Sequence, residues 1–311
     1  MIKKVFFIGN GCIENGIIPL KKLYKDIESL KTKSFLINSE KSPDSMLPLS
    51  SLADQERHFF SELFLSSRGA LDNKLIPDRQ LMALNHLAAF TSTRLELAKR
   101  FKNEDLIFNK NTLDILKKEG FFNDDIAIAT INWDNALDTL DLNHDNIIYL
   151  HGSCKKPMSM IFPTETISEI ARNHTIFKDI EPSLLKKINS PLRQKNEFLE
   201  IFNLVQKRFS FFPNDSNGLI KLYSVEIQFN DWMKEADKLF FCGINFNSYD
   251  SELINSLALF AKNNNVSSKK IVIINTSNND TKKKQTLSCI LHIPEDSIEY
   301  RIVPKLLKTL A

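Results

Sequence analysis

An amide and an imidazole follow two apolar stretches near the middle of the chain. Residues 126–131 form a short β-prone run that ends at Asn132, and residues 147–150 form a second run that ends at His151. In a parallel α/β sheet, the groups that contact a ligand collect at the carboxyl ends of the strands. Only 19 residues separate the two side chains, so a compact connection could join neighbouring strands. We therefore expect Asn132 and His151 to lie at the same edge of a sheet.

This pair of side chains suits the cleavage of a nucleotide at its ribose. Loss of nicotinamide from NAD passes through an oxocarbenium-like centre, which is favoured by polar groups that hold the ribose hydroxyls and a water. Asn132 could orient the ribose or the attacking water, and a neutral His151 is a suitable general base near neutral pH. Two alternatives stay open. His151 could have a non-catalytic role, and an oxidoreductase would need only to bind and align the cofactor.

A set of apolar runs that end in Gly, Asn or His predicts the sheet that would position these side chains. The runs are residues 5–8, 126–131, 147–150, 239–242 and 270–274, with weaker candidates at 34–37, 287–291 and 300–303. Short apolar runs of this kind fit buried parallel strands. Their shared polar endings indicate a ligand site along one edge of the sheet, although Asn and Gly are also the usual turn residues. We predict an α/β fold: a Rossmann-like, doubly wound, mainly parallel sheet with helical insertions.

The loop after the first predicted strand, Gly9-Asn10-Gly11-Cys12, is of a type that can hold a phosphate. Its two glycines let the backbone turn sharply and approach a phosphate, with free N–H groups pointing at it. The GxGxxG fingerprint is incomplete, because position 14 is Glu and Gly16 comes too late. A tight turn after a strand is the alternative.

Helical periodicity divides the chain into a core and two insertions. Apolar residues recur at three- and four-residue steps within about 52–122 and 160–208, which predicts helical insertions. The Rossmann-like core would comprise about 3–37, 125–160 and 209–305 of a single domain, 1–311. Helices are also expected over 19–30, 226–234 and 250–262. Another helix should begin near Asn111 and end at Gly120 as a C-cap.

Composition limits the classes of protein that remain. With 311 residues, 42% of them hydrophobic, the chain can bury a sizeable core. A net charge of +3 gives no direct indication of nucleic-acid binding. The four cysteines form no Cys-x-x-Cys pair, so we expect no metal site, and a reducing cytoplasm fits best. No apolar run approaches the roughly 18 residues of a membrane span.

Two short motifs carry a resemblance to a known family. Thr130-Ile131-Asn132-Trp133-Asp134, followed by Leu150-His151-Gly152-Ser153, resembles the sirtuin-like NAD-consuming domains. The similarity is closest to the zinc-free bacterial branch that degrades NAD in antiphage defence. It covers roughly residues 3–37, 125–160 and 209–280, and the helical insertions match nothing specific.

The resemblance assigns roles to residues at several strand ends. It implies that Asn132 and His151 are catalytic and that the glycine loop holds the pyrophosphate, although the usual Gly-Ala-Gly-x-Ser form is altered. The family's late Gly-x-Ser/Asn segment with a following Asp is matched by Gly243-Ile244-Asn245 and Asp250. Its strand-ending Asn, which binds the adenosine ribose, is matched by Asn275. The implied nucleotide-binding residues are Gly9, Asn10, Gly11, Cys12, Asp134, Gly243, Asn245, Asp250 and Asn275.

The implied activity is hydrolysis of NAD, as substrate, to ADP-ribose and nicotinamide without a metal. Such effectors are held inactive until an infection signal releases them. We therefore expect a homo-oligomer, or a partner such as a ring ATPase, an Argonaute-like protein or another defence-complex subunit. One alternative is a non-catalytic subunit that binds NAD or ADP-ribose, or acts as a scaffold. Another is a protein deacylase, which the missing Cys-x-x-Cys pairs of the zinc-dependent sirtuins disfavour.

Overall fold

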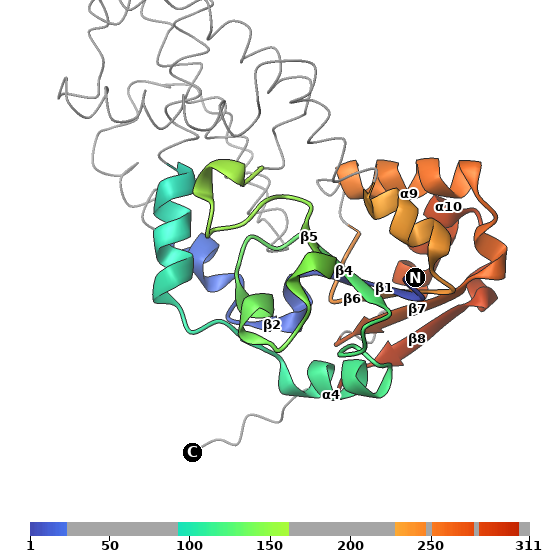
Figure 1. The fold of residues 1–311 in the computed structure, drawn as a ribbon, viewed down its shortest axis with the longest axis horizontal. Helices are drawn as coiled ribbons and strands as arrows, with labels where there is room; N and C mark the ends of the chain where they lie inside the picture. Colours follow the sequence, from blue (N-terminus) through green and yellow to red (C-terminus); the bar gives the residue numbers. More distant parts are fainter. Residues whose placement is uncertain (24–92, 162–227, 247–250, 277–279, 305–311) are drawn as a thin grey trace, which may run out of the picture. The chain divides into compact units, whose positions relative to one another are not determined.

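The computed structural model describes five stretches of the chain: residues 1–23, 93–161, 228–246, 251–276 and 280–304 (Figure 1). The chain divides into two compact units. Unit 1 comprises residues 1–17, 101–155 and 220–311, and unit 2 comprises residues 18–100 and 156–219. Residues 101–122, expected in the first insertion, belong to unit 1. The expected strand at 34–37, the greater part of both insertions and Asp250 lie outside the described residues.

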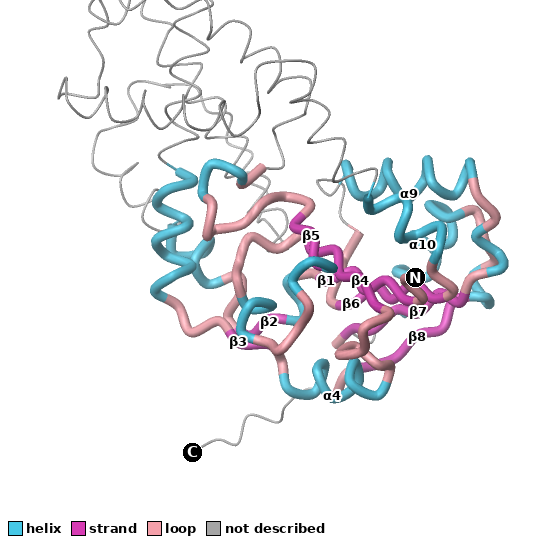
Figure 2. The backbone as a smooth tube through the Cα atoms, viewed as in Figure 1, coloured by secondary structure: helices cyan, strands magenta, loops and turns pink. Residues whose placement is uncertain are grey.

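A six-stranded parallel sheet forms the centre of unit 1 (Figure 2). Its strands are β1 (Lys4–Ile8), β4 (Ile126–Thr130), β5 (Ile147–Tyr149), β6 (Lys238–Cys242), β7 (Lys270–Asn275) and β8 (Ile298–Ile302). They lie in the order β5-β4-β1-β6-β7-β8, and every neighbouring pair is parallel. Counted along the chain, this is the order 3-2-1-4-5-6 of a doubly wound Rossmann-like fold. The predicted fold class is confirmed.

The predicted strands agree with the structure in all but one described case. All five strong apolar runs are strands, and the weaker run at 300–303 overlaps β8. The prediction of a strand at 287–291 is wrong, because these residues lie in helix α10 (Asp280–Leu291). Leu287, Ile290 and Leu291 are all buried, and their spacing of three and four residues places them on one helical face.

Phenylalanine side chains pack β1 against β6 on both faces of the sheet. Phe6 pairs with Phe240, and Phe7 with Phe241, in the register of the two strands. Both ring pairs are stacked, with centroids 4.5 Å apart. Successive side chains of a strand point to opposite faces, so each face receives one pair. All four residues are at most 1% exposed, so the two central strands are rigidly positioned below the loops that follow them.

Helices cover both faces of this sheet. On the face of Phe7, helix 228–235, α9 (Ser251–Asn263) and α10 share one core with the strands. The expected helices at 226–234 and 250–262 are thus present over the described residues. On the other face, Phe121 makes an edge contact with Phe6, at 5.0 Å between centroids.

Helix α4 (Lys110–Lys118) begins and ends as predicted, near Asn111 and Gly120. The side chain of Asn109 caps it by accepting a hydrogen bond from the N–H of Thr112 at 2.9 Å. Gly120 follows the helix with a φ of +80°, a conformation that favours glycine. No helix in the described part of the chain is long and apolar enough to cross a membrane.

Candidate functional site

The strand order reverses between β1 and β6, which is the position where doubly wound sheets bind their ligands. The glycine loop follows β1 at this point, and Gly243 follows β6. The N–H of Gly9 donates to the carbonyl of Cys242 at 2.8 Å, and that of Gly11 donates to the carbonyl of Gly243 at 3.0 Å. The candidate residues of these two loops therefore lie together at the reversal point.

The glycines of the first loop are required by this loop-to-loop contact. A Cβ on Gly9 would lie 2.7 Å from the carbonyl oxygen of Gly243, and a Cβ on Gly11 would lie 2.8 Å from its Cα. Both distances are too short for a side chain, so only glycine lets the two backbones approach this closely. Close packing of the two loops thus accounts for both glycines without a bound phosphate.

The expectation of free N–H groups in the glycine loop is wrong for Gly9, Gly11 and Cys12. The first two donate to the loop after β6, and the N–H of Cys12 donates to the carbonyl of Gly9 at 3.0 Å. Residues Asn10–Cys12 form a single 3₁₀ turn that leads into strand β2 (Ile13–Glu14), which pairs with β3 (Ile107–Phe108). Residues 13–17 separate the loop from the next helix, which begins at Ile18, near the predicted start at residue 19, and is described as far as Leu23. Burial raises the pKa of the Cys12 thiol far above its usual value, so this thiol stays protonated.

The segments that carry Asn132 and His151 run side by side beyond the ends of β4 and β5. The N–H of Leu150 donates to the carbonyl of Thr130 at 2.8 Å, and the N–H of Cys154 donates to the carbonyl of Trp133 at 2.7 Å. The imidazole of His151 hydrogen-bonds the backbone of Ile131, the residue before Asn132. Both segments therefore lie at the carboxyl edge of the sheet, and Thr130 ties them to β1 through a 3.0 Å hydrogen bond to the carbonyl of Ile8.

Two buried oxygen atoms at this edge accept no hydrogen bond from the described residues. Asn132 and Asp134 are each only 3% exposed. The Oδ1 of Asn132 and the Oδ2 of Asp134 have no partner among the described residues. The other carboxylate oxygen of Asp134 accepts from the N–H of Ala136 at 2.9 Å. Buried polar atoms are almost always hydrogen-bonded, and an unsatisfied one costs about 1–3 kcal/mol. These two atoms therefore have an unused capacity to accept a hydrogen bond.

Burial shifts the protonation of the two ionisable residues in opposite directions. It raises the pKa of Asp134 to about 6, helped by the charge of Asp138 and opposed by the N–H of Ala136. His151 keeps some exposure, yet the surrounding atoms desolvate its imidazole and lower its pKa to about 4, against the effect of the Ile131 hydrogen bond. Near neutral pH, His151 is therefore uncharged and a weak base, whereas Asp134 is largely ionised.

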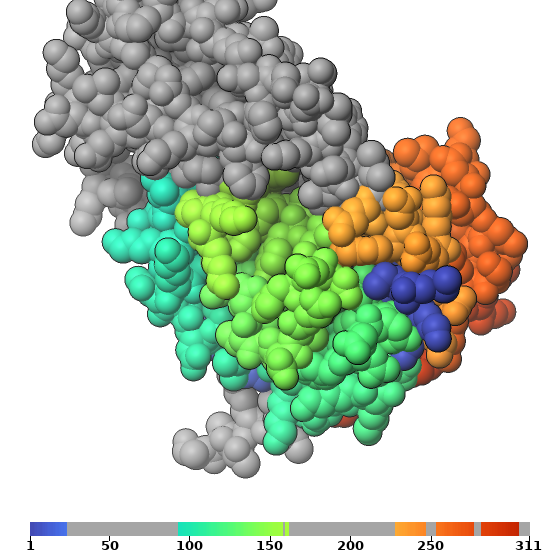
Figure 3. Space-filling model, in the orientation of Figure 1, coloured from blue at the N-terminus to red at the C-terminus, as the bar shows by residue number. Residues whose placement is uncertain are grey.

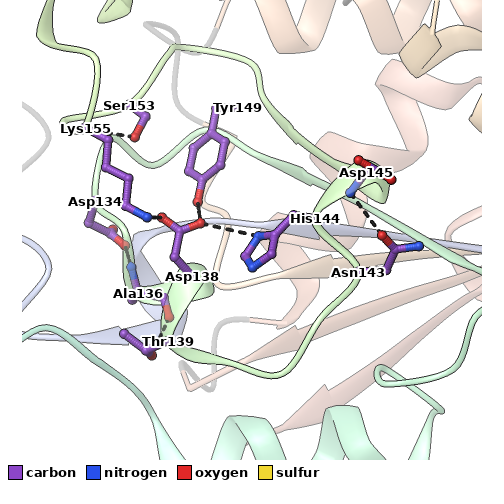
Figure 4. Close-up of polar contacts among 10 residues, drawn as sticks. All are labelled: Asp134, Ala136, Asp138, Thr139, Asn143, His144, Asp145, Tyr149, Ser153 and Lys155. Carbon is purple, nitrogen blue, oxygen red and sulfur yellow. Dashed lines mark hydrogen bonds and ion pairs between the residues drawn. The ribbon is translucent and has the colours of Figure 1, made fainter.

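Asp138 contacts Tyr149 and Lys155, which lie on either side of His151 in the sequence (Figure 4). It lies in the 3₁₀ turn Ala136–Thr139 that follows Asp134. Its Oδ1 accepts from the hydroxyl of Tyr149 at 3.0 Å, and its Oδ2 pairs with the Nζ of Lys155 at 2.7 Å. The Nδ1 of His144 is 3.6 Å from Oδ1. These contacts of Asp138 were not predicted from the sequence, where their only signal is a second carboxylate four residues after Asp134.

The partners of Asp138 reach the surface. The side chains of His144 and Lys155 are 58% and 54% exposed, whereas that of Asp138 is only 14% exposed. Residues 101–155, in green tones, form a continuous part of the surface seen in Figure 3. Asp138 is thus a shielded carboxylate that pairs with an exposed cationic group, and its charge acts on Asp134.

The candidates Asn245, after β6, and Asn275, at the end of β7, are both hydrogen-bonded to other residues. Asn275 is 5% exposed; its Nδ2 donates to the carbonyl of Ile244 at 3.2 Å, and its Oδ1 accepts from the N–H of Thr276 at 2.8 Å. Asn275 therefore holds the loop after β6, and its contact with a ribose stays a prediction. Asn245 is exposed and accepts from the Nζ of Lys283 at 2.8 Å. Burial lowers the pKa of Lys283 to about 8.

No protein-family model, curated protein or solved structure matches this chain. Within the described ranges, no group of three or more His, Cys, Asp or Glu side chains could hold a metal ion. What distinguishes the site is thus its position on the sheet and its two unsatisfied acceptors. An arrangement of this kind can bind hydroxyl groups and place a carboxylate beside them.

Proposed function

We propose that this protein is an NAD glycohydrolase, which cleaves NAD to ADP-ribose and nicotinamide. The observation that carries the proposal is the pair of buried acceptors, Asn132 Oδ1 and Asp134 Oδ2, at the carboxyl edge of the sheet. Ribose hydroxyls are hydrogen-bond donors, so a ribose bound here would satisfy both atoms. A sheet with this strand order suits a dinucleotide at this edge. The resemblance of the Asn132 and His151 motifs to sirtuin-like domains supports the same substrate.

In the proposed reaction, the acceptors stabilise the developing positive charge on the ribose. Asn132 orients the ribose or the attacking water, and the carboxylate of Asp134 would favour an oxocarbenium-like centre on a ribose bound beside it. His151, neutral and bonded to the Ile131 backbone, shapes the site beside them. The pyrophosphate would lie near the exposed residue Asn10, since the amides of Gly9, Gly11 and Cys12 are already bonded.

The resemblance alone supports the biological setting that we propose. The protein would act in the cytoplasm as an effector that depletes NAD during antiphage defence. Its activity would be controlled in a homo-oligomer or by a partner ATPase or other defence-complex subunit. The NAD chemistry and this setting are separable, and the first is tested without the second.

Fluorescence from etheno-NAD, with loss of NAD followed by chromatography, tests the activity. Asn132→Ala removes an acceptor and His151→Ala removes the imidazole, and we expect each to lower hydrolysis by roughly 100-fold or more. Asn143→Ala removes an exposed amide in the same region and should leave the rate unchanged. Full activity in both of the first two variants would refute their assignment to the reaction.

A second candidate function is a non-catalytic subunit that binds NAD or ADP-ribose, or serves as a scaffold. The closed hydrogen bonding of the glycine loop favours it, because the amides of Gly9, Gly11 and Cys12 are not free to cradle a phosphate. Calorimetry would then detect ADP-ribose binding with no turnover of NAD. Turnover that depends on Asn132 would exclude this alternative.

A further inference from the structure

Asp134 has one carboxylate oxygen that is fixed and one that is uncommitted. Oδ1 accepts the N–H of Ala136 at 2.9 Å, which holds the orientation of the carboxylate. Oδ2 is buried and has no hydrogen-bond partner in the part of the chain that the structure describes. A general base needs this combination: a fixed direction and a free lone pair within reach of the proton to be taken.

The charge of Asp134 acts on residues of both the glycine loop and the segment around His151. Its charge helps to raise the pKa of Cys12, in the glycine loop, and those of Tyr149 and Cys154, on either side of His151. The effect of a charge on the pKa of another group weakens with distance. Asp134 is therefore close both to the reversal point of the sheet and to the His151 segment.

His151 is poorly suited to the role of base in this structure. Burial lowers the pKa of its imidazole to about 4, although the hydrogen bond to the Ile131 backbone acts in the opposite direction. A base is most effective when its pKa lies near the working pH, and a group with a pKa of about 4 accepts a proton weakly at neutral pH. The pKa of Asp134, about 6, is closer to that optimum.

We infer that Asp134 is the general base that activates the attacking water, an inference that rests on the proposed hydrolysis of NAD. The water oxygen forms a bond to C1′ of the nicotinamide ribose as the bond from C1′ to the ring nitrogen breaks. The electron pair of that bond returns to the nicotinamide ring, which leaves neutral. The proton of the water passes to Asp134 Oδ2 and then to solvent. His151 becomes a positioning residue for the segment that contains Asn132.

The groups that face Asp134 set the pH at which this base is charged. Burial raises its pKa, the backbone N–H groups of Ala136 and of Asp134 itself lower it, and the like charge of Asp138 raises it further. Cys12, Tyr149 and Cys154 are neutral near pH 7, because burial raises the pKa of each of them. Asp138 itself is paired with Lys155. The carboxylate should therefore lose its charge, and its activity as a base, as the pH falls through about 6.

Single-turnover hydrolysis of NAD by excess full-length protein, measured from pH 4.5 to 8.5, tests the inference. The wild-type rate should fall tenfold per pH unit below about pH 6. Asp134→Asn should be at least about 100-fold slower and should lack this acid limb. Asp145→Asn, which changes an exposed carboxylate, is the matched control and should behave as the wild type.

Azide separates the loss of a base from a structural defect. Azide attacks as an anion without giving up a proton, so it should restore turnover in Asp134→Asn and yield azido-ADP-ribose. A rescue with azide but not with chloride supports the inference. No rescue would mean that Asp134 is structural and would overturn it.

A second variant keeps Asp134 in place. Asp138→Asn removes a like charge and should move the acid limb to lower pH, and an unchanged limb contradicts the assignment. If the wild type hydrolyses NAD and Asp134→Asn keeps both its rate and its acid limb, Asp134 is not the base, although the proposed function stands. If stoichiometric wild-type protein leaves NAD intact, the proposed function fails and the inference fails with it.

Discussion

Gly243 and Cys12 lie so close together that a Cβ on Gly243 would be 2.6 Å from the backbone nitrogen of Cys12. Gly243 also has a φ of +64°, which other residues rarely adopt. The contact joins the loops after β1 and β6, where the strand order reverses. The site therefore depends on a glycine more than 200 residues away from the glycine loop in sequence.

Gly243→Ala should destabilise the fold strongly. The new methyl group clashes with backbone that cannot move aside and adopts an unfavourable φ, so we expect a loss of about 2–4 kcal/mol in the free energy of unfolding. Denaturant unfolding measures it. Gly16→Ala is the control: its Cβ would lie 3.1 Å from the Ile13 side chain and 3.6 Å from the Ile13 carbonyl oxygen, and should cost less than about 1 kcal/mol. Equal effects of the two substitutions would contradict the role of the loop contact.

Two buried asparagines should respond in opposite ways to replacement by leucine. Asn132 has an oxygen with no partner among the described residues, whereas both polar ends of the Asn275 amide are hydrogen-bonded. Removing an unsatisfied acceptor relieves a cost, so Asn132→Leu should leave stability unchanged or raise it by about 1 kcal/mol. Asn275→Leu leaves the carbonyl of Ile244 and the N–H of Thr276 without partners, and should cost about 2–3 kcal/mol.

Thermal and denaturant unfolding of the two variants, beside NAD hydrolysis, provide the comparison. We expect Asn132→Leu to be stable and inactive, which is the pattern of a residue kept for ligand binding at the expense of stability. A loss of stability in Asn132→Leu as large as in Asn275→Leu would mean that its amide is structural.

Local sequence was sufficient to predict the sheet but not the contacts between its loops. Runs such as 5–8 and 270–274 are apolar enough to be strands wherever they lie, and polar residues mark where they end. The run at 287–291 was misleading, because five residues are too few to distinguish a strand from the buried face of a helix that begins at residue 280. The pairing of β4 with β5 followed from their short connection.

The glycine loop shows what local sequence could not provide. Two glycines after a strand are compatible with a phosphate site or with close backbone packing. The distinction depends on Gly243, and nothing near Gly9 in sequence indicates that this residue approaches it. The same applies to Asp138, whose partners Tyr149 and Lys155 are brought to it only by the pairing of the strands.

The ion pairs of Glu299 with Arg301 and Lys270, at the edge of the sheet, should make the stability of the fold depend on pH in strong acid. Glu299 on β8 accepts from the Nε of Arg301 at 2.5 Å and pairs with Lys270 of β7 at 2.8 Å, and these bonds lower its pKa to about 2. Because the carboxyl pKa is lower in the folded protein than its unfolded value of 4.5, the ionised carboxylate stabilises the fold above pH 4.5. This contribution is lost as the pH falls towards 2. The group is exposed, so the effect should be below about 1 kcal/mol.

Urea unfolding of the wild type and of Glu299→Gln over pH 2–7 measures this contribution. The difference in stability should be constant above about pH 5 and disappear near pH 2. High salt should reduce it, since exposed charges are screened. A difference that persists at pH 2 would show that Glu299 acts through packing and not through its charge.

The imidazole of His151 should make the fold sensitive to mild acid. Its pKa is lowered from 6.5 to about 4, so the folded protein binds a proton at this site less readily than the unfolded chain does. The resulting contribution is fully present above pH 6.5 and is lost as the pH falls through about 4, with an upper limit of about 3 kcal/mol. The raised pKa of Asp134 acts in the opposite direction, so the two must be separated by variants.

His151→Gln keeps a hydrogen-bond donor for the Ile131 backbone but cannot take up a proton in this range. The wild type should lose stability relative to His151→Gln between pH 6.5 and 4, as measured by urea unfolding at half-unit steps. In Asp134→Asn the free energy of unfolding itself should fall over this pH range, because the Asp134 carboxyl no longer offsets the effect of His151. Parallel pH curves for the wild type and His151→Gln would mean that the imidazole titrates alike in the folded and unfolded chains, and that burial does not hold it neutral beside Asn132.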